Sequence, residues 1–89
     1  MQQLRAHIVE CRTGMKSGEL KWHARMLCEE LLGANRIGVV RSTGTNAVGG
    51  PTEVEVSAYV VRDGDEEKAR EFFESLAIDL GGRPVLASA

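Results

Sequence analysis

The segment from Glu53 to Val60 constrains the fold more than any other part of the chain. Apolar Val54, Val56, Ala58 and Val60 alternate there with Glu53, Glu55, Ser57 and Tyr59. A period of two is typical of a β-strand that buries one face and leaves the other open. The chain is therefore expected to build a sheet that is covered on one side only.

Three further segments have the composition of strands. Residues 4–12 are rich in β-capable side chains and end at a Thr-Gly turn, and residues 36–41 contain Ile37, Val39 and Val40. Residues 84–87 are short and apolar, and their proline is tolerated in an edge strand. We expect these three segments to form the remaining strands of the sheet.

Two segments show helical spacing. The first has an expected N-cap at Ser17 and a stop at Gly33, and its apolar positions are Leu20, Ala24, Leu27, Cys28 and Leu31. The second begins where Asp63 and Glu66 resemble a capping box and ends at two glycines, and its apolar positions are Ala69, Phe72, Phe73, Leu76 and Leu80. Each helix is expected to pack one apolar stripe against the sheet.

The resulting order, βαββαβ, resembles the ferredoxin-like α+β fold. That resemblance implies a two-layer sandwich, in which a four-stranded antiparallel sheet carries both helices on one face. A chain of 89 residues has room for one core, so we expect a single domain over residues 1–89. A domain of this size has a thin stability margin, which self-association would improve.

Charge and composition exclude several classes of partner. The net charge of -2, with both signs mixed along the chain, argues against nucleic acid. RNA-recognition motifs share the topology, but Tyr59 is the only aromatic residue on the first or third strand. No apolar run is long enough for a membrane span or a signal peptide, so we expect a cytoplasmic protein. Cys11 and Cys28 are interpreted as buried free thiols, and neither a metal site nor a cofactor is indicated.

Two glycine-rich loops are candidates for an anion site. Right-handed crossovers make the first and second strands parallel, so the loops after them emerge at the same end of the sheet. The candidate ligands for a phosphate or carboxylate are Arg12, Lys16, Ser17, Arg41 and Asn46. The simpler interpretation, which we favour, is that these glycines serve turns and that Ser17 caps a helix.

Acylphosphatases share the expected fold and are similar to this chain in fold only. In that family an arginine lies in the loop after the first strand and an asparagine lies near the end of the second, and the placement of Arg12 and Asn46 is loosely similar. The family signature GxVQGVxFR is absent, and Cys-Arg-Thr-Gly-Met-Lys-Ser-Gly stands in its place. The resemblance therefore implies the fold and leaves open whether the loops act on a phosphate compound.

Two surfaces are candidates for an interface. Trp22 and Met26 fall opposite the apolar stripe of the first helix, on a face that also carries charges. The alternative is that another segment of the chain covers Trp22. On the open sheet face, we expect Arg5, His7, Val9 and Cys11 to lie on one side of the first strand and to meet the third strand. There, a mixed patch of His7, Val9, Tyr59 and Val61 is expected to serve a sheet-face or edge dimer.

Catalytic chemistry has little support in the sequence. His7 is a candidate base, but a lone strand histidine more often packs in an interface. The residues do not assemble into a nucleophile and base pair. The leading hypothesis is a small homo-oligomeric binding module, most simply a dimer, that binds a protein or a small ligand. The alternative is a small enzyme or anion-binding protein that uses the glycine-rich loops.

Overall fold

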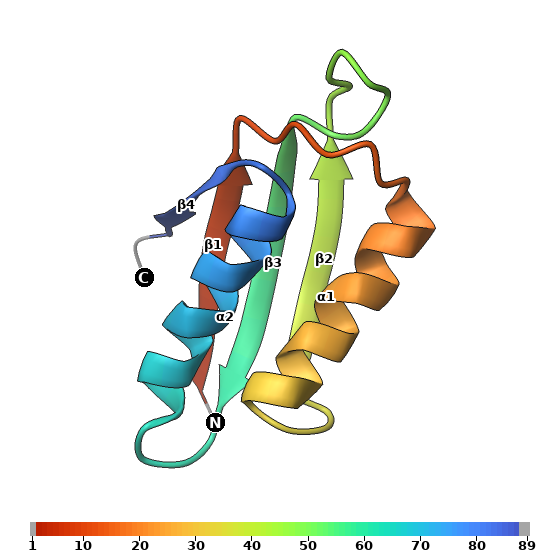
Figure 1. The fold of residues 1–89 in the computed structure, drawn as a ribbon. Helices are drawn as coiled ribbons and strands as arrows, with labels where there is room; N and C mark the ends of the chain where they lie inside the picture. Colours follow the sequence, from red (N-terminus) through yellow and green to blue (C-terminus); the bar gives the residue numbers. More distant parts are fainter. Residues whose placement is uncertain (1, 88–89) are drawn as a thin grey trace.

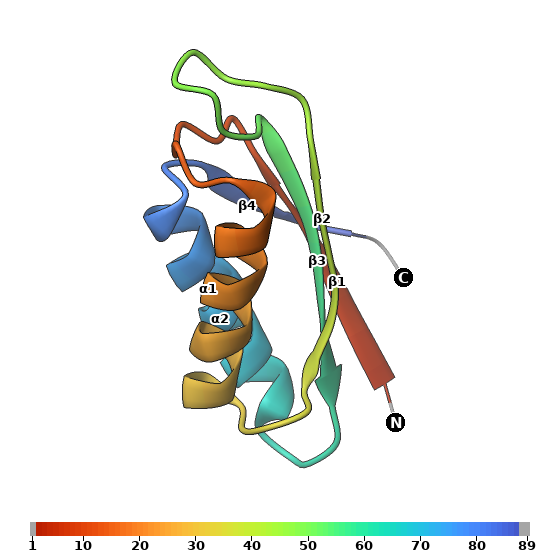
Figure 2. The ribbon, with the colours of Figure 1, turned by 90° about the vertical axis from the view of Figure 1, so that its right-hand side faces the viewer.

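Six elements follow one another in the order expected from the sequence (Figure 1). The computed structural model describes residues 2–87. Its elements are β1 (Gln2–Val9), α1 (Ser17–Leu31), β2 (Ile37–Thr43), β3 (Glu53–Val60), α2 (Asp65–Asp79) and β4 (Arg83–Leu86). The strands form one sheet in the order β2-β3-β1-β4, and all neighbours are antiparallel. Both helices lie on one face (Figure 2), so the chain has the ferredoxin-like α+β sandwich fold.

Burial follows the expected alternation of β3 except at Ser57, which was expected on the open face and is buried. Val54, Val56 and Ala58 are fully buried under the helices, and Ala6 and Ile8 of β1 are buried beside them. The antiparallel register places Ala6 opposite Val56 and Ile8 opposite Val54. Because facing side chains of neighbouring strands pack against each other, these pairs form the floor of the core.

The two helices cover the sheet unequally. α2 lies over β1, β3 and β4, whereas α1 lies over the edge strand β2 and beside α2 (Figures 1 and 2). Phe72 and Phe73 of α2 are fully buried, with ring centroids 5.5 Å apart. Within residues 2–87, no helix is long and apolar enough to cross a membrane.

The expected position of Cys11 on the open sheet face is wrong. β1 ends at Val9, and Glu10 adopts a left-handed conformation with φ of 59°. This turn breaks the alternation of the strand, so Cys11 enters the core and is 3% exposed. A single residue in the left-handed region is a local feature that strand periodicity does not reveal.

The expected helix caps are also wrong. α1 begins at Ser17, and the N-cap is Lys16, whose side chain makes no capping bond. α2 begins at Asp65 after an N-cap at Gly64, so the expected capping box of Asp63 and Glu66 does not form. The expected helix ends are closer, because Gly33 and Gly81 both take positive φ directly after the C-caps.

Candidate functional site

The loops after β1 and β2 emerge at the same end of the sheet and pack against each other, as expected from the topology. Asn46 holds them together. Its Nδ2 donates to the carbonyl oxygens of Cys11 (3.2 Å), Thr13 (2.7 Å) and Pro51 (2.9 Å). Its Oδ1 accepts the backbone N–H groups of Val48 (2.9 Å) and Gly50 (3.2 Å). The Asn46 side chain is thus engaged by its own chain on both polar atoms, as expected of a group that fixes a loop.

Two of the other four anion candidates, Lys16 and Arg41, have partners within the chain. Lys16 Nζ donates to the carbonyl oxygen of Gly49 at 3.0 Å. Arg41 lies on the open sheet face, where its Nη1 is 3.7 Å from Glu55 Oε1. Arg12 is exposed in the loop after β1, and Ser17 is the first residue of α1. Asn46 and Lys16 therefore hold the two glycine-rich loops against each other by donating hydrogen bonds to main-chain carbonyls.

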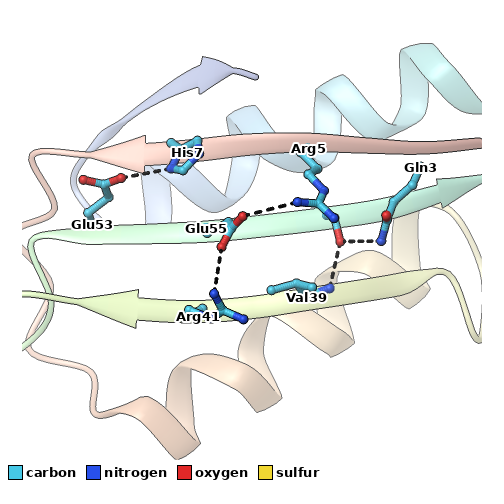
Figure 3. Close-up of polar contacts among 8 residues, drawn as sticks. Gln3, Arg5, His7, Val39, Arg41, Glu53 and Glu55 are labelled. Atoms are coloured by element: carbon cyan, nitrogen blue, oxygen red, sulfur yellow. Dashed lines mark hydrogen bonds and ion pairs between the residues drawn. The ribbon is translucent and has the colours of Figure 1, made fainter. Parts of the chain in front are cut away.

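The open sheet face carries cross-strand polar pairs (Figure 3). His7 Nδ1 lies 2.9 Å from Glu53 Oε1, and Arg5 Nη1 lies 3.7 Å from Glu55 Oε2. Glu55 therefore lies between Arg5 of β1 and Arg41 of β2. A face with this many charged groups is far more polar than the buried centre of a typical interface.

The expected patch on this face is not assembled. Tyr59 lies opposite Gln3, whereas His7 lies opposite Glu55, so His7 and Tyr59 are four residues apart along the sheet. Val9 lies at the far end of β1, and Val61 follows the opposite end of β3. The ion pairs of Arg5 and Arg41 with Glu55 lie between these positions (Figure 3).

A β-bulge interrupts the free edge of the sheet. The pairing of β2 with β3 shifts register between Ile37 and Val40. Ser57, which is buried, accepts the Val39 N–H at 2.7 Å and a bond from Gln3 Nε2 at 3.0 Å. A Cβ at Gly38 would overlap the Ser57 hydroxyl, so a larger residue at this position would have to displace the Ser57 side chain.

The outer face of α1 is exposed as the sequence predicts. Trp22 is 64% exposed and Met26 is 44% exposed, so no segment within residues 2–87 covers the indole. Beside Trp22, a groove of about 490 Å³ runs between α1 and the edge strand. It is lined by Lys21, Trp22, Arg25, Ile37, Gly38 and Val40.

Met26 belongs to a different hollow from Trp22. A second depression of about 440 Å³ is lined by His23, Met26, Leu27, Glu29 and Glu30. The first depression has the cations Lys21 and Arg25 on its rim, and the second has the anions Glu29 and Glu30. On the outer face of α1, Trp22 therefore lines a depression that contains two cations, and Met26 lines a depression that contains two anions.

The buried titratable groups have structural roles. Burial raises the pKa of the Cys28 thiol to about 11, and burial together with Glu53 raises the pKa of Cys11. Both thiols are protonated at neutral pH, which makes them poor nucleophiles. Among the residues that the structure describes, no group of three His, Cys, Asp or Glu side chains is placed to hold a metal ion.

Among residues 2–87, Asp65 is the one buried carboxylate, and sequence reasoning missed it. Its Oδ2 accepts the N–H groups of Arg62 (2.9 Å) and Val61 (3.1 Å) and the guanidinium of Arg36 (2.6 Å). The Arg62 N–H, the Arg36 guanidinium and the Val61 N–H hold the pKa of Asp65 well below its usual value. An aspartate beside a glycine at the start of a helix was the available signal, and the sequence contained two such aspartates.

Comparison with known proteins identifies no relative. The chain matches no protein-family model, no curated protein and no solved structure.

Proposed function

We propose that this chain is a small homo-oligomeric binding module, most simply a dimer, that has no catalytic chemistry of its own. Its binding surface is the outer face of α1 together with the groove beside β2. The observation that carries the proposal is the 64% exposure of Trp22, the only tryptophan, on the wall of a groove of about 490 Å³. Exposed aromatic side chains beside a pocket are typical of the residues that dominate binding energy.

The contacts between the two glycine-rich loops support the same proposal, because they argue against an anion site at these loops. An anion-binding protein or small enzyme at the glycine-rich loops needs free donors that converge on a ligand. Asn46 and Lys16 instead bond to main-chain carbonyls, and Arg41 pairs with Glu55 on another surface. The α1 surface, in contrast, combines an exposed aromatic side chain with a groove beside it.

The reduced state of the two cysteines fits a cytoplasmic location, which we include in the proposal. Cys11 and Cys28 are buried and form no disulfide. Free thiols of this kind persist in compartments that keep cysteine reduced.

Native mass spectrometry tests the proposed function. We expect a dimer for the wild-type protein and a monomer for Trp22→Ala, because the substitution removes the largest apolar group of the surface. Ile78→Ala is the matched control, since Ile78 is 78% exposed on the other helix, and this variant is expected to remain dimeric. The proposal is wrong if Trp22→Ala and Met26→Ala change neither the mass nor the binding of any partner.

A further inference from the structure

The groove between α1 and β2 is lined by charged side chains of one sign only. Its lining includes Lys21 and Arg25, and none of its lining residues is acidic. We propose that this groove binds a short acidic segment of a partner protein, in which one apolar side chain lies between two carboxylates. The inference rests on the proposed function, because it names a class of partner for the groove in that binding surface.

Both cations of the groove are available to a partner. Lys21 and Arg25 are exposed, and neither takes part in an ion pair within residues 2–87. By contrast, Arg36, which directly precedes β2, pairs with the buried Asp65. Carboxylates of a partner would supply the opposite charges that Lys21 and Arg25 lack in the described part of the chain.

The glutamates of α1 limit the length of the acidic segment. Glu19 precedes Lys21 on the helix, and Glu29 follows Arg25 by about one turn. Both glutamates are exposed, and neither lines the groove. A long polyanion, such as a nucleic acid strand, would extend past the two cations toward these glutamates, where like charges repel. The groove therefore favours a pair of carboxylates over a long acidic run.

The strand side of the groove is apolar. Ile37 and Val40 line it, and both are only partly buried against the core. Trp22 adds an indole that is 64% exposed. An apolar side chain of the partner would bury these three side chains further, and burial of apolar surface favours binding.

The two walls of the groove suit an extended chain whose side chains alternate. α1 and β2 lie beside each other (Figure 1). Lys21 and Arg25 are separated by a helical rise of about 6 Å. Alternate residues of an extended chain are about 6.6 Å apart and point to the same side. Two carboxylates at positions i and i+2 therefore reach the two cations, while the side chain at i+1 points toward Ile37 and Val40.

The bulge in β2 directs recognition to side chains. An extended partner that added a strand to the sheet would need a regular free edge, and bulges are one way in which proteins block such an edge. The pairing of β2 with β3 shifts register between Ile37 and Val40, and the Val39 N–H bonds inward to Ser57. We therefore expect the alternating side chains of the partner to supply its specificity.

Selection from a phage library of random dodecapeptides on the full chain tests this inference. We expect the enriched peptides to carry two acidic residues separated by one apolar residue. The Kd of an enriched peptide, labelled with a fluorophore, is then measured by anisotropy for the wild type and for Lys21→Glu/Arg25→Glu. The double variant should weaken binding about tenfold or more, because both attractive contacts become repulsive.

Lys68→Glu/Arg70→Glu is the matched control, since it makes the same change of charge at two exposed positions of α2. This control should bind the peptide within about twofold of the wild type, because distant surface charges are screened by salt. Circular dichroism checks that both double variants are folded.

The inference is overturned if no peptide is enriched, if the enriched peptides lack the acidic pair, or if both double variants lose the peptide equally. Native mass spectrometry of the same proteins records the oligomeric state separately. A dimer that binds no acidic peptide would overturn this inference alone. A monomer that binds one would overturn the proposed dimer alone.

Discussion

The two helices have the same length, but α2 buries its aromatic side chains and α1 exposes its tryptophan. α1 and α2 each contain 15 residues and lie on the same face of the sheet (Figure 1). α2 buries six residues, including Phe72 and Phe73, whereas α1 buries three and presents Trp22 to the outside. α2 therefore supplies most of the helical part of the core, whereas the outer face of α1, over the edge strand, is exposed.

Exchange of an aromatic residue for alanine should lower the free energy of unfolding far more on α2 than on α1. Phe72→Ala leaves a large cavity in the core and is expected to cost about 3–5 kcal/mol of unfolding free energy. Trp22→Ala removes an exposed side chain and should change the stability of the monomer by less than about 0.5 kcal/mol. Urea denaturation at low protein concentration measures both values, and Phe72→Leu provides a milder core variant that stays folded. Equal losses for Phe72→Ala and Trp22→Ala would contradict the division of roles.

A substitution at the N-terminus of α2 should also lower Tm more than a substitution at the N-terminus of α1. Asp65→Asn leaves the Arg36 guanidinium without its carboxylate and should lower Tm by roughly 10 °C. Ser17→Ala, at the start of α1, is expected to lower Tm by about 2 °C or less, because Ser17 makes no cap. Differential scanning calorimetry at pH 7 checks both, and a larger effect at Ser17 than at Asp65 would refute the comparison.

The same carboxylate predicts a pH dependence. The pKa of Asp65 is lower in the folded protein than in the unfolded chain, so its contribution to stability is present above the unfolded pKa. The contribution is lost as the pH falls below about 4 toward the folded value. The wild type should therefore lose its Tm advantage over Asp65→Asn on acidification, as measured by thermal melts from neutral to acidic pH. A constant difference between the two proteins would show that Asp65 does not titrate in this way.

The hydrogen bonds of the Asn46 side chain between the two glycine-rich loops should have a smaller effect on stability. Asn46→Ala removes bonds to five main-chain groups and is expected to cost about 1 kcal/mol, because water can replace many of these bonds in a partly exposed loop. Hydrogen exchange should show faster exchange at Val48 and Gly50, whose N–H groups bond to Asn46 Oδ1. Unchanged protection at both positions would mean that the hydrogen bonds to Asn46 Oδ1 do not form in solution.

The smallest expected effect is that of an added anion. If the glycine-rich loops have a structural role and bind no anion, about 10 mM phosphate should raise Tm by no more than about 1 °C. A thermal shift assay with phosphate and acetyl phosphate measures this. A larger rise that Arg12→Ala abolishes would restore the alternative of an anion site at these loops.

Periodicity predicted the fold because each element carries its own repeat. The alternation from Glu53 to Val60 and the helical stripe around Phe72 required no knowledge of distant contacts. Side chains whose roles depend on long-range register were not predictable in this way. Tyr59 was expected beside His7, and the pairing of Gln3 with Tyr59 separates them.

The candidate site was predictable only in part, for the same physical reason. The exposure of Trp22 and Met26 follows from their angle on the helix, which local spacing gives. The groove beside Trp22 depends on how far α1 lies from β2, which is a property of the packed layers. The clasp at Asn46 needs a loop whose carbonyls converge on one amide, and composition does not show that convergence.

The fluorescence of Trp22 reports directly on whether this side chain is buried when copies of the chain associate. It is the only tryptophan, and it lies in the surface that we assign to association. The emission maximum is measured while the wild-type protein is diluted through the range in which sedimentation shows the oligomer dissociating. We expect a blue-shifted emission in the oligomer and a red shift on dissociation, because the indole then becomes exposed to water. An emission maximum typical of exposed indole at every concentration, in a protein that remains oligomeric, would contradict it.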